Sequence, residues 1–383
     1  MFVMKIAVFT DTFIPNINGI VTSVLNSSKA MAAKGHKVFI FTVKPKNKMH
    51  EIRLLDNKIP VFYYPRLKII NYPDFQLAVP RIVDMIVKIK KIKPDIIHIH
   101  TPSFLGWSAL MIAQIFKIPT IGTYHTFLPD FIEYIPLPRI NKSKVMKRLT
   151  WSYTRRFYNK CSIVTTPSIA MKQELENHGI KRKVLFISNG VDTKRFHPIK
   201  TKKTGKTILH VGRIGYEKNI HVLLRAFSEL LKKEKKARLV IAGKGPDLEK
   251  LKIFARQLRI ERNVEFLGPV PYDKLPKLYS SADIFATAST IETEGLVILE
   301  AMACSLPIIG VNKLAVPYVV KHNENGFIAQ PGNYKEIARY MDILLKDRRL
   351  REKFGKESLR FVKKFSLKDI INQLEDIYQR LKR

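Results

Sequence analysis

Two cations, Arg213 and Lys218, lie in the segment HVGRIGYEKN, which runs from His210 to Asn219. The segment begins as an apolar strand, turns at Gly212 and enters a helical pattern near its end. In open α/β sheets, ligands gather at the carboxyl ends of the strands, and helix N-termini attract phosphate. A guanidinium that forks onto phosphate oxygens, with an ammonium beside it, could therefore hold a diphosphate and stabilise it as it leaves. By itself, such a stretch is more often an ordinary surface loop.

Two carboxylates eight residues apart, Glu292 and Glu300, form the second candidate group. Gly295 lies between them and would let the backbone approach a ligand closely. Glu300 falls in a predicted helix that otherwise carries apolar side chains, Leu296 among them. A carboxylate in such surroundings could accept hydrogen bonds from ribose hydroxyls, and an exposed glutamate on an amphipathic helix is the alternative.

These residues need elements that hold them, and the chain alternates short apolar runs with longer stretches of helical period. This alternation predicts an α/β fold with mostly parallel sheets. A polar, basic gap at 194–206 predicts a linker between two similar α/β domains, at 1–193 and 207–365. Residues 366–383 predict an amphipathic terminal helix that docks on a domain surface. The predicted strands are Lys5–Phe9, Lys37–Thr42, Ile96–Ile99, Thr120–Gly122, Ile163–Thr165, Val184–Ile187, Thr207–Val211, Arg238–Ala242, Val264–Phe266, Ile284–Ala286 and Pro307–Gly310.

Composition narrows the class of protein. The chain has 383 residues, of which 46% are hydrophobic, so it is long enough for two domains and is neither disordered nor collagenous. Its two cysteines, Cys161 and Cys304, argue against a disulfide framework and fit a reducing compartment. The first residues read as a strand rather than a secretory leader, and Ile96–Phe116 as strand, turn and helix rather than a membrane span.

Several motifs are missing from the sequence. It contains neither GxGxxG nor a P-loop, so Rossmann dehydrogenases and P-loop ATPases lose support. No two aspartates are two positions apart, so the Asp-x-Asp metal clamp of many nucleotide-sugar enzymes is absent. His98 and His100 alternate along a predicted strand with no cysteine nearby, which favours packing or hydrogen-bonding histidines over a zinc site.

Taken together, these motifs resemble those of glycosyltransferase family 4, the retaining enzymes of GT-B fold. The resemblance rests on Gly212-Arg213 with Glu217-Lys218, on the Glu292-x7-Glu300 spacing, and on NGVDTKRFHP at 189–198. It covers nearly the whole chain, with the motifs in the family's order. It implies two tandem Rossmann-like domains, the first binding the acceptor and the second most of a nucleotide-sugar donor. It also implies that no metal and no cofactor takes part beyond this donor, which we expect to be UDP-linked.

The resemblance assigns roles to residues of the second domain. Arg213 and Lys218 would bind the diphosphate, Glu300 the ribose, and Glu292 the neighbourhood of the donor sugar. The further residues that it places at the donor are Gly212, Gly243, Gly245, Gly295 and Leu296.

In the first domain, the loop TDTFIPNINGIVTSV resembles the family's opening loop. There Asn18 and Gly19 would bring backbone amides near the donor phosphates. The segment TYHT resembles the one whose histidine contacts the transferred sugar, which gives that role to His125. An ordinary strand-end histidine bonded to backbone is the alternative for His125.

Three motifs, ETEGL, NGIVTS and TYHT, are similar to the branch of membrane-lipid glycosyltransferases that includes diacylglycerol glucosyltransferases. This chain carries Asn219 and Ser305 at positions where the family commonly has glycine. We expect transfer of a hexose, glucose, with retention of configuration, to a lipid acceptor such as diacylglycerol. A soluble or polyprenyl-linked acceptor is the alternative.

The net charge of +36 attracts nucleic acid, anionic membranes or phosphorylated ligands. Residues 66–93 carry seven basic and two acidic side chains, and residues 139–160 carry eight basic and no acidic ones. Both segments suit helices on an anionic bilayer, so we expect a cytoplasmic enzyme peripheral at the inner face of the membrane. Solvated helix faces and a lysine-rich proteome are the alternatives. A basic, non-catalytic protein that binds nucleic acid or membranes would leave the donor motifs unexplained, so we expect no nucleic-acid partner.

Overall fold

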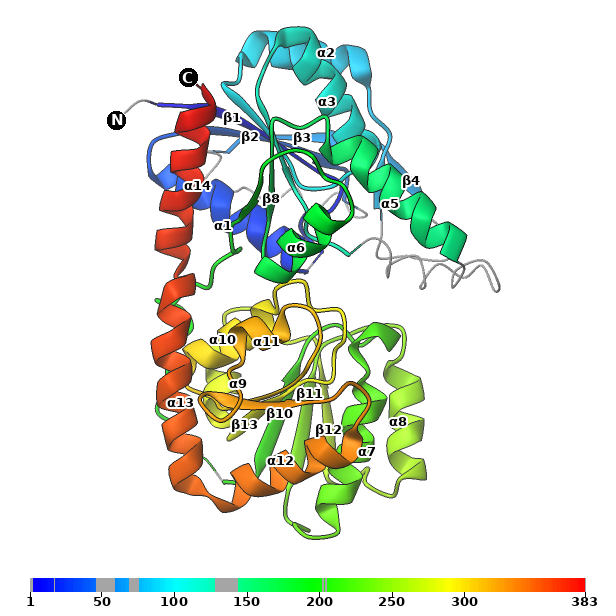
Figure 1. Cartoon of the computed structure of the whole chain (residues 1–383), viewed down its shortest axis with the longest axis vertical. Coiled ribbons are helices and arrows are strands. Elements are labelled where there is room, and N and C mark those ends of the chain that lie inside the picture. Colours follow the sequence, from blue (N-terminus) through cyan, green and yellow to red (C-terminus); the bar gives the residue numbers. More distant parts are fainter. Residues whose placement is uncertain are drawn as a thin grey trace. The chain divides into compact units, whose positions relative to one another are not determined.

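The computed structural model describes residues 3–16, 18–45, 59–68, 76–127, 144–201, 203 and 205–382. The chain forms two compact units (Figure 1). The first unit comprises Met1–Asn189 with Asp369–Arg383, and the second comprises Gly190–Lys368. The segment 194–206 thus belongs to the second unit, in which Phe196 is buried.

The first unit is built on a sheet of seven strands, all paired in parallel, in the order β3-β2-β1-β6-β7-β8-β9. All the residues of β6 and β7 are buried, so both faces of the sheet are covered and the strands read as continuous apolar or small-residue runs. The strands are β1 (Lys5–Thr10), β2 (Lys37–Val43), β3 (Val61–Tyr64), β6 (Ile96–Ile99), β7 (Thr120–Thr123), β8 (Ile163–Thr166) and β9 (Val184–Phe186). A short antiparallel pair, β4 (Arg66–Lys68) and β5 (Gln76–Ala78), stands apart from this sheet.

The second unit contains a sheet of six strands, again all parallel, in the order β12-β11-β10-β13-β14-β15. The strands are β10 (Thr207–Val211), β11 (Arg238–Ala242), β12 (Val264–Gly268), β13 (Ile284–Ala286), β14 (Ile308–Val311) and β15 (Gly326–Ala329). Every predicted strand is confirmed, with ends that differ by two residues at most. The strands β3, β4, β5 and β15 were not predicted from the sequence.

Helices connect the parallel strands, as parallel pairing requires. In the first unit they are α1 (Gly19–Ala33), α2 (Ile82–Ile92), α3 (Phe104–Phe116), α5 (Lys144–Tyr158) and α6 (Ile169–Asn177). In the second unit they are α7 (Ile220–Leu231), α8 (Leu248–Gln257), α9 (Leu275–Ser281), α10 (Leu296–Ala303) and α11 (Val316–Val319). The helices α12 (Tyr334–Lys346) and α13 (Arg348–Val362) follow the last strand, β15. Two apolar clusters, one on each side of β10, form the core of the second unit.

The terminal helix α14 (Leu367–Lys382) packs on the first unit, although the chain directly before it belongs to the second. Its Glu375 lies 2.5 Å from Lys34 Nζ and 3.0 Å from His36 Nε2. Its Tyr378 is buried, with the hydroxyl 2.6 Å from His98 Nδ1. The chain therefore returns to complete the first unit with its last helix.

Candidate active site

In each sheet, the strands that follow the first one along the chain are added on one side of it and then on its other side. In the first unit β1 lies between β2 and β6, and in the second β10 lies between β11 and β13. In open α/β sheets, ligands bind outside the carboxyl ends of the strands at such a reversal. Three of the predicted residues follow the strands at these places: Asn18 follows β1, Lys218 follows β10 and Glu292 follows β13. His125 follows β7, which is one strand farther from the reversal, next to β6.

Lys218 and Glu292 form an ion pair that joins the loops after β10 and β13, with Nζ 2.6 Å from Oε1. Beside them, the amide of Asn219 donates to Thr290 Oγ1 at 3.1 Å. Burial alone would raise the pKa of Glu292, but the charge and the hydrogen bond of Lys218 outweigh it and lower that pKa. The glutamate is therefore ionised at neutral pH and holds the ammonium at the reversal of the sheet.

Arg213, the second predicted cation, belongs to the same loop. Its Nη1 lies 3.4 Å from Oε1 of Glu217, whose side chain is buried. The Arg213 side chain is 32% exposed, so part of the guanidinium surface can reach a ligand. Arg213 and Lys218, which were predicted to act together, thus lie in the same loop. A separate carboxylate orients each cation, Glu217 for Arg213 and Glu292 for Lys218.

Close packing of the backbone explains why glycine occupies positions 243 and 245. A Cβ on Gly243 would lie 1.8 Å from the carbonyl oxygen of Gly212, and a Cβ on Gly245 would lie 2.0 Å from that of Ile214. The Ile214 N–H also donates to the carbonyl of Lys244 at 2.9 Å. The loops after β10 and β11 therefore touch backbone to backbone, which only residues without a side chain permit.

The helix α10 starts at the same edge of the sheet. Its N-cap is Gly295, with φ +82°, and Leu296 is its first residue. Glycine offers no capping side chain, and the first turn contains no acidic residue. The positive end of the helix dipole is therefore unneutralised in its first turn and suits a phosphate.

Glu300 lies within α10 and is only 6% exposed, so the exposed-glutamate alternative is wrong. The hydroxyl of Tyr279 donates to its Oε2 at 2.9 Å. Burial raises the pKa of Glu300 to about 7, although the Tyr279 hydrogen bond lowers it in part. A buried carboxylate of this kind gains from further hydroxyl donors, as the predicted ribose contact would provide.

In the first unit, Asn18 is the N-cap of α1, and Gly19 is the first residue of that helix. Asn18 Oδ1 accepts from the N–H of Val21 at 2.9 Å, and its amide donates to Thr12 Oγ1 at 3.0 Å. Both Asn18 and Gly19 are exposed. The helix therefore presents its N-terminal backbone to solvent at the carboxyl end of β1, where the resemblance places the donor phosphates.

His125 is buried just beyond β7, and its Nε2 lies 2.8 Å from His100 Nδ1. Burial lowers the pKa of His125 to about 3, so the ring is neutral at physiological pH. The ring of His125 therefore contacts a second buried histidine. The sequence assigned His100 only a packing or hydrogen-bonding role, and its spacing from His125 did not reveal the pair.

Asp11 is a residue that the sequence did not single out. It follows β1, is buried, and accepts from the Ala78 N–H and from Thr101 Oγ1, each at 2.8 Å, as well as from the Ser103 hydroxyl. Burial raises the pKa of Asp11 to about 7, although the hydrogen bonds from Ala78 and Thr101 lower it in part. The sequence did contain a signal for this residue, since Asp11 is an acidic side chain directly after an apolar strand. In the structure it links the loop after β1 to the segments that contain Ala78 and Thr101.

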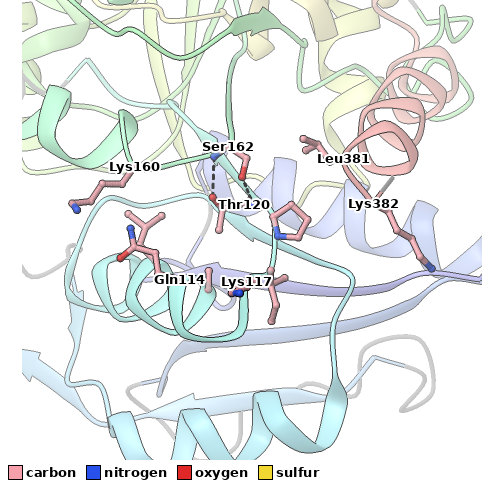
Figure 2. Close-up of a pocket in the computed structure, with 11 residues that line it drawn as sticks. Gln114, Lys117, Thr120, Lys160, Ser162, Leu381 and Lys382 are labelled. Atoms are coloured by element: carbon pink, nitrogen blue, oxygen red, sulfur yellow. Dashed lines mark hydrogen bonds between the residues drawn. The ribbon is translucent and has the colours of Figure 1, made fainter.

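A hollow of about 480 Å³ lies in the first unit at the other edge of the sheet (Figure 2). Thr120 begins β7 and Ser162 precedes β8, so both mark the amino ends of their strands. Lys117, Lys160 and Lys382 also line the hollow. It contains none of the predicted site residues.

Among the residues that the structure describes, no group of three or more His, Cys, Asp or Glu side chains could hold a metal ion. No helix in the described ranges is both long and apolar enough to cross a bilayer.

Comparison with known proteins identifies the family. Residues 17–195 match the family described as "Glycosyltransferase Family 4", and residues 191–361 match "Glycosyl transferases group 1". The chain is 32% identical to the alpha-monoglucosyldiacylglycerol synthase of Streptococcus pneumoniae, over 80% of this chain and 70% of that protein. It is 30% identical to the enzyme of the same name from Acholeplasma laidlawii, over 80% of each chain.

Solved structures agree on the fold. The sucrose-phosphate synthase of Thermosynechococcus elongatus superimposes with a TM-score of 0.84 over 99% of both chains, at 20% identity. Anabaena Alr3699/HepE in complex with UDP-glucose superimposes with a TM-score of 0.79, at 19% identity, over 98% of this chain and 100% of its own. The chain has two α/β units, each built on a parallel sheet, and it has the GT-B fold. It belongs to glycosyltransferase family 4 and is a glycosyltransferase.

Proposed function

We propose that this enzyme transfers glucose from UDP-glucose to a lipid acceptor such as diacylglycerol, with retention of configuration, at an anionic membrane surface. The observation that carries the proposal is the 32% and 30% identity to two alpha-monoglucosyldiacylglycerol synthases over four fifths of the chain. The UDP-glucose complex of a protein of the same fold is consistent with this donor.

The donor would bind mainly to the second unit. Arg213 and Lys218 would contact the diphosphate, whose remaining charge would face the N-terminus of α10. Glu300 would accept from the ribose hydroxyls, and Glu292 would hold Lys218 in place next to the donor sugar. Gly212, Gly243, Gly245, Gly295 and Leu296 would line this site.

In the reaction, the acceptor hydroxyl oxygen would form a bond to the anomeric carbon on the face from which the diphosphate leaves. The bond between that carbon and the phosphate oxygen would break, and the hydroxyl proton would pass to the departing phosphate. Negative charge grows on the diphosphate as it leaves, so the two cations stabilise the transition state more than the bound donor. His125 would position the sugar, and the N-terminus of α1, with Asn18 and Gly19, would approach the phosphates.

The acceptor would reach the first unit from a membrane. On α2, Val83 is 77% exposed and Val87 is 60% exposed, and Lys90 and Lys91 are exposed within the next turn. These side chains give one helix both apolar and cationic contacts for an anionic bilayer.

The helix α5 has a similar exposed set. Its Val145 and Leu149 are 61% and 57% exposed, and they alternate with exposed Lys144, Lys147 and Arg148. Each cation near an anionic surface contributes about 1 kcal/mol, so α2 and α5 together would hold the enzyme there reversibly. The predicted basic segments also include residues 69–75 and 139–143, which lie outside the described residues.

The test of the reaction incubates the purified enzyme with UDP-glucose, UDP-galactose, UDP-GlcNAc or GDP-mannose and with diacylglycerol in phosphatidylglycerol vesicles. We expect glucosyl-diacylglycerol by mass spectrometry, with the α-anomeric proton visible by NMR. Lys218→Met should lower kcat by about a hundredfold or more, because the transition-state charge loses its cation. A product formed only from another donor or only on a soluble or polyprenyl acceptor would refute the proposed substrates.

A second test concerns the membrane. We expect the enzyme to sediment with phosphatidylglycerol vesicles at low salt and to be released at high salt. Val83→Ser with Val87→Ser should weaken this binding several-fold. Ile253→Ser provides the matched control, since Ile253 is 52% exposed on α8 of the second unit. Equal loss in both variants, or binding to oligonucleotides alone, would refute the membrane role of α2.

A further inference from the structure

We propose that His100 is a positioning residue for the transfer reaction: it fixes the orientation and the tautomer of His125. The inference rests on the proposed function in one respect, the contact of His125 with the transferred sugar. The arrangement of the two rings stands independently of that contact.

Two neighbouring strands bring the rings together. His100 comes directly after β6, His125 comes two residues after β7, and the two strands pair in parallel. The ring planes lie within 13° of each other, and His100 Nδ1 is 2.8 Å from His125 Nε2. That distance is a full hydrogen bond between two nitrogens, so one of them must carry the proton and the other must be bare.

The protonation of His100 decides which ring donates. Burial lowers the pKa of both rings, so each carries a single proton at neutral pH. His100 Nε2 is buried and has no hydrogen-bond partner among the described residues. A bare nitrogen in such a place costs less than an N–H without an acceptor, because buried unpaired donors are the less tolerated case.

It follows that the proton of His100 sits on Nδ1 and is donated to His125 Nε2. His125 then carries its own proton on Nδ1, which turns that side of its ring into a donor. In the proposed contact with the sugar, His125 would therefore have the ring orientation and the tautomer that His100 imposes on it.

His100 is itself held in place from the other side. The ring of His98 lies 4.1 Å from that of His100, centroid to centroid. His98 Nδ1 is 2.6 Å from the hydroxyl of Tyr378, and its Nε2 is 2.6 Å from Thr123 Oγ1. Because both nitrogens of His98 are hydrogen-bonded, its ring is held in place where it packs against His100. One of these bonds comes from Tyr378, so α14 takes part in positioning the histidines.

The decisive measurement needs no substrate. Long-range ¹H–¹⁵N spectra of the whole enzyme, labelled with ¹⁵N-histidine, distinguish protonated from bare ring nitrogens. His125→Gln and His100→Asn assign the signals of the two rings among the ten histidines. We expect a protonated Nδ1 and a bare Nε2 on His125, and a protonated Nδ1 on His100. The opposite pattern, with the proton on His125 Nε2, would overturn the inference whatever the acceptor of the enzyme is.

Kinetics then tests the positioning role. His100→Asn and His100→Leu have nearly the same shape, but only asparagine keeps an N–H donor near the place of Nδ1. We expect the leucine variant to lose roughly tenfold in kcat with a smaller change in KM for the donor, and the asparagine variant to recover most of the loss. Wild-type kcat in the leucine variant, or equal loss in both variants, would contradict the role.

A double substitution separates positioning from general damage to the fold. In a His125→Ala background, His100→Leu should cost no further activity, because the ring that it positions is gone. A full additional tenfold loss would show that His100 acts on something other than His125. If no donor and acceptor pair gives turnover, the proposed function fails, whereas the NMR result still decides the tautomer.

Discussion

Glu300→Gln is the substitution whose effect follows most directly from the structure. Burial raises the pKa of Glu300 to about 7 from its ordinary value of 4.5. The folded protein therefore binds this proton more tightly than the unfolded chain does. The stabilising contribution of Glu300 is fully present below about pH 4.5 and is lost as the pH rises through about 7. Each pH unit between the two pKa values corresponds to about 1.4 kcal/mol, so the loss reaches roughly 3 kcal/mol by pH 8.

Glutamine keeps an acceptor for the Tyr279 hydroxyl but cannot ionise. The variant should therefore gain up to roughly 3 kcal/mol over wild type at pH 8, relative to their difference at pH 5. Both tryptophans, Trp107 and Trp151, lie in the first unit, so their fluorescence does not report on the second. Hydrogen exchange of the β11 amides, followed by mass spectrometry, measures opening of the second unit directly. A difference between variant and wild type that does not change with pH would refute the reasoning.

The same titration should appear in donor binding. In the proposed contact, ribose hydroxyls would donate to the ionised carboxylate of Glu300. Donor binding should then favour the deprotonated form, and affinity for UDP-glucose should fall up to tenfold for each pH unit below about 7. UDP-glucose is the right probe because its diphosphate does not titrate in this range, unlike the terminal phosphate of UDP. Calorimetry in two buffers of different ionisation enthalpy should detect the released proton. A pH-independent affinity in the wild type would count against the ribose contact.

Two further substitutions test the backbone at the donor site. Gly245→Ala should destabilise the second unit by roughly 1–3 kcal/mol and weaken donor binding, because its Cβ would lie 2.0 Å from the Ile214 carbonyl oxygen. Gly268→Ala is the control, since Gly268 has φ +70° but no heavy atom within 4 Å of the position of a Cβ. Ser305, with φ +63°, follows the C-terminus of α10 where the Leu306 N–H donates to the Ala301 carbonyl at 3.1 Å, so Ser305→Gly should stabilise by about 0.5–1 kcal/mol in hydrogen exchange. Equal effects of the two alanine variants, or no gain from Ser305→Gly, would show that these backbone arguments are wrong.

The strands could be predicted from the sequence because buried strands of a parallel sheet must be apolar on both faces. Residues 207–211 and 238–242 were predicted with the bounds that the structure has. The edge strand β3 was not predicted, although Pro60 and Pro65 bound its run of four residues. Three of these four residues are only half-buried in the structure. β15 begins at Gly326 and ends at Ala329, and both residue types are depleted in strands, so its sequence carries a weak strand signal.

The glycines of the donor site illustrate a different limit. The sequence suggested that Gly243 and Gly245 approach a ligand, whereas the structure shows that each first has to admit the backbone of a neighbouring loop. Likewise, Asn219 and Ser305 stand where the family commonly has glycine, and both have positive φ, at 50° and 63°. A sequence displays the residue type, but only the fold displays the dihedral angle that the residue must adopt.

By itself, the sequence determined the two α/β units, the cations and carboxylates of the donor motifs and the family. Those features depend on local periodicity and on short spacings along the chain. Only the tertiary structure decided which side chains meet: Lys218 with Glu292, 74 residues apart, and His100 with His125, 25 residues apart. Such pairs form where parallel strands that lie side by side end at one edge of a sheet, and strand order is a property of the packed chain.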